Sequence, residues 1–147
     1  MNTHPYLRAF LAGAFIPTLI LPIMLTGFVV LRLILQVPFP FERGIIFPMA
    51  LVPSLWALWN MLWIGSRRMH LPIGVHGALL PFLLLPSGAL LATALHILSI
   101  GAGGVTWFNS VYVPYTWIVP VFCAAIAVYY LMWKYVVGFL NRTLGIA

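Results

Sequence analysis

Long stretches of this chain contain no charged residue, and this absence is the feature that most constrains its fold. Lys, Arg, Asp and Glu are missing from the 23 residues between Arg8 and Arg32 and from the 23 between Arg43 and Arg67. The 65 residues of segment 69–133 lack them as well. About 20 apolar residues, each rising about 1.5 Å, cross a hydrocarbon core of about 30 Å as one helix. The sequence therefore predicts an integral membrane protein.

The longest uncharged run is too long for a single span, and a polar, glycine-rich segment at 99–110 divides it. Four transmembrane helices follow, at residues 7–36, 44–66, 73–99 and 114–141. The composition agrees, because 5% of the residues are charged whereas soluble domains carry about 25%. The connections are too short for a soluble domain, so we expect residues 1–147 to form one all-α transmembrane domain.

Basic residues are distributed unevenly between the two sides of the predicted spans. Two of the seven, Arg32 and Arg43, lie on one side, and Glu42 partly offsets their charge. The other five lie on the side of the N-terminus. Cytoplasmic loops are enriched in Lys and Arg, so both termini are predicted to be cytoplasmic, in a bacterial inner membrane. The five residues on the cytoplasmic side are Arg8, Arg67, Arg68, Lys134 and Arg142.

Each predicted span contains two prolines. A proline inside a helix removes one backbone hydrogen bond and bends the helix, so we expect a proline-kinked bundle in which Pro48 and Pro114 begin their helices. We interpret the kinks as structural; alternatively, they open a cavity near the midplane, as broken helices do in transporters. The pairs are Pro17 and Pro22, Pro48 and Pro53, Pro81 and Pro86, and Pro114 and Pro120.

Small residues four positions apart predict faces where helices approach closely. Ala9 with Gly13 in the first span and Gly88 with Ala92 in the third have this spacing. The pattern does not distinguish a helix of this chain from a helix of another protein.

The second span carries the most distinctive polar side chain. Trp56, Asn60 and Trp63 follow at i, i+4 and i+7 and share a helix face. An asparagine is costly in hydrocarbon unless it is hydrogen-bonded. We expect Asn60 to bond to a neighbouring backbone; alternatively, Asn60 and the two indoles line a ligand cavity together with Ser54 and Ser87.

Groups suited to catalysis or metal binding are scarce. Glu42 is the sole carboxylate, and we expect it to form an ion pair with Arg32 or Arg43 at the outer mouth of the bundle. The four histidines lack the spacing of metal ligands. The sequence therefore predicts no catalytic residue, no cofactor and no metal site. The basic residues of the second loop, Arg67, Arg68 and His70, are expected to contact anionic lipid headgroups.

Three function classes are compatible with these features. The first is a non-enzymatic packing or accessory subunit, or a scaffold, of a membrane complex. The second is a small oligomeric channel or carrier for a neutral or anionic solute, and the third is a lipid-modifying intramembrane enzyme. The expected partners are membrane lipids and either copies of the chain or another membrane protein. Nucleic acid is excluded because there is no water-soluble basic domain.

Overall fold

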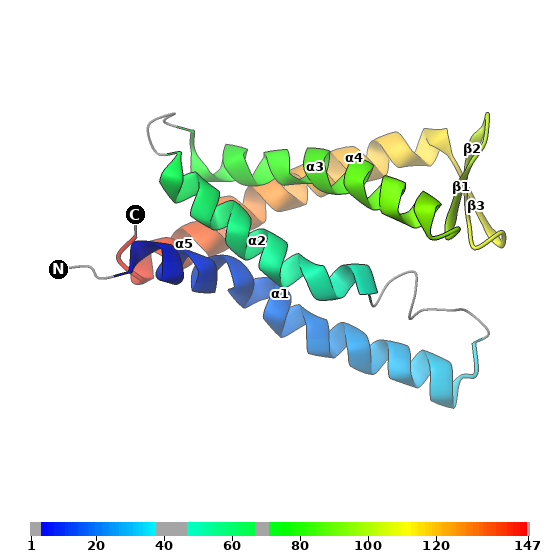
Figure 1. The fold of residues 1–147 in the computed structure, drawn as a ribbon, viewed down its shortest axis with the longest axis horizontal. Helices are drawn as coiled ribbons and strands as arrows, with labels where there is room; N and C mark the ends of the chain where they lie inside the picture. Colours follow the sequence, from blue (N-terminus) through cyan, green and yellow to red (C-terminus); the bar gives the residue numbers. More distant parts are fainter. Residues whose placement is uncertain (1–3, 38–46, 67–70, 147) are drawn as a thin grey trace. The chain divides into compact units, whose positions relative to one another are not determined.

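The computed structural model describes residues 4–37, 47–66 and 71–146, and most of them are helical (Figure 1). Helix α1 (Pro5–Val29) continues into a π-helical turn, η1 (Val30–Ile34). Helices α2 (Phe47–Gly65) and α3 (Ile73–Ala94) follow. Helix α4 (Tyr115–Leu131) runs through a second π-helical segment, η4 (Met132–Val137), into α5 (Gly138–Thr143). The chain divides into two compact units, unit 1 (residues 1–70 and 139–147) and unit 2 (residues 71–138).

Three helical stretches are long and apolar enough to cross a membrane: Pro5–Ile34, Ile73–Ala94 and Tyr115–Thr143. This confirms a mostly helical chain with the character of a membrane protein. Helix α2 coincides with the predicted second span and has 19 residues. Pro114 is the N-cap of α4, and Pro48 is the second residue of α2, so both prolines stand at helix starts, as expected. The remaining prolines of the four pairs lie inside helices.

In unit 1, α1 and α2 are antiparallel and meet through small residues. Ala9, Ala12 and Gly13 of α1 are buried, as is Ala57 of α2. A Cβ atom added at Gly13 would lie 2.6 Å from the carbonyl oxygen of Trp56 and 2.8 Å from Cα of Ala57. The two backbones are therefore in direct contact, and Ala9 and Gly13 form a packing face as predicted. A side chain at position 13 would separate the helices.

In unit 2, α3 and the α4–η4 helix form an antiparallel pair whose largest buried side chain is Trp133. The indole lies on Gly77, where an added Cβ would overlap the ring and Cβ of Trp133. His76 packs edge-on against the same indole, with the ring centroids 5.9 Å apart. One turn earlier, a Cβ added at Gly74 would come within 2.9 Å of the Tyr130 ring. Glycines on α3 thus provide the space that the aromatic side chains of the partner helix fill.

The segment that joins α3 to α4 is a small antiparallel sheet, where the sequence pattern predicts only an irregular interruption. Its strands are β1 (Leu98–Ile100), β2 (Gly104–Trp107) and β3 (Val111–Pro114), in the order β1-β2-β3. The protein is therefore not purely α-helical. The β-branched and aromatic residues that follow the glycines are typical of short strands, but the glycines themselves favour a loop.

Helix α3 ends five residues before the predicted position 99 because its last turn closes in a Schellman motif. The amide of Ile97 donates to the Ala92 carbonyl, and the amide of His96 donates to the Thr93 carbonyl. His96 has the left-handed conformation this motif requires at C′, with φ of 55°. The chain then turns directly into β1.

The contact between Gly77 and Trp133 gives a sharp test of unit 2. We expect Gly77→Ala to lower the thermal unfolding temperature in detergent strongly, because forcing a methyl group into a filled core costs about 1–3 kcal/mol. The matched control is Gly88→Ala in the same helix, where an added Cβ has no heavy atom within 4 Å. The control should be neutral or slightly stabilising. Equal effects of the two substitutions would contradict the packing described.

Candidate functional site

The polar centre of unit 1 is a pair of asparagines, Asn60 of α2 and Asn141 of α5. Each side chain is 0% exposed. Asn60 Nδ2 donates to Asn141 Oδ1 at 2.9 Å, and Asn141 Nδ2 donates back to Asn60 Oδ1 at 3.0 Å. The second hydrogen of Asn60 Nδ2 is directed at the carbonyl of Ala9 in α1, at 2.8 Å. A single carboxamide therefore connects three helices that lie far apart in the sequence.

Small neighbours make this pair possible. Gly13 and Ala9 allow α1 to approach α2 so closely that a Cβ at Gly13 would lie 3.0 Å from Cβ of Asn60. At that separation the Ala9 carbonyl falls within reach of the amide. An apolar side chain at position 13 would move α1 away and break the hydrogen bond. The packing face and the polar bonds therefore depend on each other.

The end of α5 is also fixed to α1. Arg8 Nη1 donates to the Leu144 carbonyl at 3.1 Å, and a cation at a helix C-terminus is favoured by the helix dipole. Gly145, with φ of 67°, closes the helix, because the Ile146 amide bonds to the Asn141 carbonyl. Backbone and side chain of Asn141 thus both take part in seating the C-terminal turn. In unit 1, the first turn of α1 and the end of α5 lie together.

The residues predicted to line a cavity have different surroundings. Trp56 and Asn60 are buried and Trp63 is half-buried, but Ser54 is exposed. Ser87, in unit 2, is exposed, and its hydroxyl donates to the Leu83 carbonyl of its own helix at 2.6 Å. Within unit 1, Ser54 therefore lies at the surface of α2 and Asn60 lies in the interior. Whether these residues bind a ligand stays a prediction.

Most of the predicted surface groups lie outside the described residues. These are Glu42 and Arg43 of the expected outer ion pair, and Arg67, Arg68 and His70 of the expected headgroup site. The remaining member, Arg32, lies in the π-helical turn η1 and is exposed.

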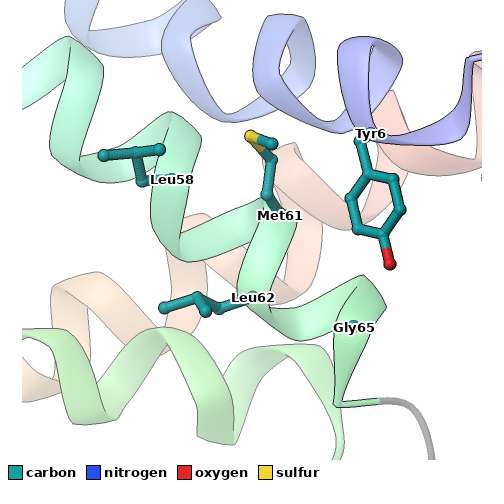
Figure 2. A pocket seen from close by; sticks show the side chains of 5 residues that line it. All are labelled: Tyr6, Leu58, Met61, Leu62 and Gly65. Atoms are coloured by element: carbon teal, nitrogen blue, oxygen red, sulfur yellow. The ribbon is translucent and has the colours of Figure 1, made fainter.

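An apolar groove of about 460 Å³ lies on unit 1, on the surface of α2 beside the first turn of α1 (Figure 2). Figure 2 shows Leu58, Met61 and Leu62 projecting from α2, with the Tyr6 ring standing beside Gly65. None of the residues predicted to line a cavity belongs to it. Among the side chains that line the groove, the Tyr6 hydroxyl is the polar group. The groove suits a hydrocarbon chain better than a polar solute.

No family model, no curated protein and no solved structure matches this chain. Across residues 4–37, 47–66 and 71–146, no three His, Cys, Asp or Glu side chains gather as a metal ion would require. The buried amides lack a group that titrates near neutral pH, so the pair can hold helices together but supplies no acid or base.

Asn141 is the residue that sequence reasoning missed. It is the asparagine of an Asn-Arg-Thr sequon, which draws attention to glycosylation rather than to packing. Its amide is fully buried, so a glycan on it is incompatible with this fold. A second lone amide near the end of an apolar span was the available signal, because a buried amide in lipid needs a partner.

A double-mutant cycle tests the amide pair. We expect Asn60→Ala and Asn141→Ala each to destabilise the protein by about 1–3 kcal/mol, because each leaves a buried amide unsatisfied. The double variant should be less destabilised than the sum of the two. The measurement is reversible unfolding in mixed micelles. Ser87→Ala, which removes an exposed bond, is the control and should change little; additive effects of the two asparagines would contradict the pairing.

Proposed function

We propose that this chain is a non-enzymatic, multi-pass membrane protein that serves as a packing or accessory subunit, or scaffold, of a membrane complex. The observation that carries the proposal is the closed amide pair of unit 1. Its buried polar groups bond to one another and to the Ala9 carbonyl. A pathway for a polar solute needs such groups on its wall instead. Because these amides bond to each other and to the protein backbone, they favour a structural role.

The proposed topology has four spans in a proline-containing bundle, with α2 as the second span and both termini in the cytoplasm of a bacterial cell. Support comes from unit 1, where Arg8, near the N-terminus, bonds to Leu144, near the C-terminus. A chain whose two termini lie on the same side of the membrane must cross it an even number of times. The basic residues then favour the cytoplasm for that end.

Cysteine labelling tests this topology. In a Cys123→Ser background, Ser110→Cys should react with an impermeant maleimide added to intact cells, whereas Ser66→Cys should react only after the membrane is opened. Ser110 lies in the turn between β2 and β3, and Ser66 follows α2. The two positions lie on opposite sides of the membrane in the proposed topology. Labelling of Ser66→Cys in intact cells would overturn it.

The proposed partner is another membrane protein that packs on the exposed faces of the helices. Gly88 of α3 is exposed, and an added Cβ there has no heavy atom within 4 Å. With Ala92 it offers the spacing that permits close helix approach. Anionic lipids are the other expected contact, through the basic cytoplasmic residues.

Native mass spectrometry of the protein gently extracted from its own membrane tests the accessory role. We expect a different polypeptide at a fixed ratio, and we expect Gly88→Leu to reduce that ratio because it blocks close approach. Gly27→Leu is the matched control, since Gly27 also has open space around it but lacks the small partner four residues on. A homo-oligomer that retains a small ligand would contradict the proposal.

The interior prolines favour a second candidate, an oligomeric channel or carrier for a neutral or anionic solute. Pro17 and Pro22 in α1 and Pro81 and Pro86 in α3 interrupt the backbone bonding at two levels of each helix. If this candidate is right, purified protein in liposomes should carry solute at a rate that falls on Ser54→Ala or Ser87→Ala. Flux equal to that of empty liposomes across a broad solute panel would exclude it.

A further inference from the structure

The three-stranded sheet between α3 and α4 has one apolar face and one largely polar face. Residues paired across antiparallel strands point to the same side, and neighbours along a strand point to opposite sides. The pairings Leu98 with Trp107 and Ile100 with Val105 therefore set one face, which continues onto β3. Ser99, Thr106 and Tyr112 align on the other. The apolar face comprises Leu98, Ile100, Val105, Trp107, Val111 and Val113.

Much of the apolar face is open to the surroundings. Ile100 is 63% exposed and Val111 is 49% exposed, while Val105, Trp107 and Val113 are half-covered. The two exposed side chains lie on the edge strands, β1 and β3, so the open surface reaches both margins of the sheet.

The connections hold the sheet at the ends of its two helices. Three residues separate the end of α3 from β1, and β3 passes into α4 without a linker. The Tyr115 amide, at the first position of α4, donates to the Gly103 carbonyl, and its hydroxyl donates to the Gly101 carbonyl at 2.7 Å. The turn between β1 and β2 is therefore fastened to the start of α4. The sheet is therefore held beside the ends of α3 and α4 (Figure 1).

The residues around the sheet match the membrane interface in composition. No charged residue occurs anywhere in segment 98–117. Tyr115 and Trp117 are exposed on the first turn of α4, and Trp107 and Tyr112 lie on the strands. Tyr and Trp concentrate at the headgroup level of membranes. The edge strands limit how deeply the sheet can enter the membrane. Backbone groups at a sheet edge need water or headgroups as hydrogen-bond partners and are not tolerated in the hydrocarbon core.

We propose that the sheet lies on the outer surface of the membrane, with its apolar face turned into the lipid and its polar face toward water. In this proposal the apolar face of the sheet contacts membrane lipid and not another protein. This proposal rests on α3 and α4 crossing the membrane, as proposed above. In this arrangement the sheet anchors the outer ends of both helices through Ile100, Val111 and Trp107.

Spin labels on adjacent residues of β1 test the orientation. Ile100→Cys and Ser99→Cys, each in the full-length Cys123→Ser protein, are labelled and reconstituted in vesicles of phosphatidylethanolamine and phosphatidylglycerol. Collision with oxygen reports lipid, and collision with a water-soluble nickel chelate reports water. We expect the ratio of oxygen to nickel collisions to be several-fold higher at Ile100 than at Ser99. Val105→Cys and Thr106→Cys on β2 repeat the comparison should a β1 variant fail to fold.

Two outcomes would overturn the orientation. Equal access of nickel to both faces would place the whole sheet in water. An immobile Ile100 label that neither reagent reaches would show that protein, a partner or a second copy, covers the apolar face.

Native Cys123, exposed within α4, separates this proposal from the membrane crossing on which it rests. A spin label at Cys123 that the nickel chelate reaches would refute the crossing itself. A label there that only oxygen reaches would support the crossing, and the collision ratios at Ile100 and Ser99 then decide the orientation of the sheet.

Discussion

The hydrogen bonds between Asn60 and Asn141 are the interaction on which unit 1 depends. A buried carboxamide that loses its partners costs about 1–3 kcal/mol, so each of these two side chains is stabilised by meeting the other. Their meeting fixes the C-terminal turn against α2, and the remaining Asn60 hydrogen fixes α1 through the Ala9 carbonyl. The small residues at Ala9, Gly13 and Ala57 then follow as a geometric requirement. The hydrogen bonds of Asn60 therefore require small side chains where α1 and α2 meet.

The helices of unit 2 are held together by a different kind of contact. Its buried centre is an indole rather than an amide pair, and Gly74 and Gly77 on α3 leave the space that Tyr130 and Trp133 occupy. Association of helices in lipid has no hydrophobic driving force and relies on close packing and polar bonds. Unit 1 uses both of these contributions, whereas the described core of unit 2 is dominated by packing. The positions of the glycines therefore indicate which helix faces pack together, and the overall hydrophobicity of the chain does not.

The sequence predicts what depends on local chemistry and misses what depends on tertiary pairing. The helical spans follow from the uncharged runs, and the starts at Pro48 and Pro114 follow from the fixed φ of proline. The pairing of Asn60 with Asn141 was missed because it depends on tertiary packing across 81 residues of sequence, although the lone amide near the end of the last span was a signal for it. The sheet was missed because Gly101, Gly103 and Gly104 signal a loop, although Gly104 is needed where a Cβ would lie 2.9 Å from Cα of Pro114. The predicted outer ion pair and headgroup site lie largely outside the described residues.

The central claim is that the buried amides satisfy each other and are not a site for solute. Selective ¹⁵N labelling of asparagine gives a direct view, since the chain has only Asn2, Asn60, Asn109 and Asn141. Nuclear magnetic resonance in micelles should show two side-chain amides that exchange slowly with water and give mutual cross-relaxation, while the amide of the exposed Asn109 exchanges fast. Rapid exchange of the Asn60 amide, with no cross-relaxation to Asn141, would show a wet site and contradict the account.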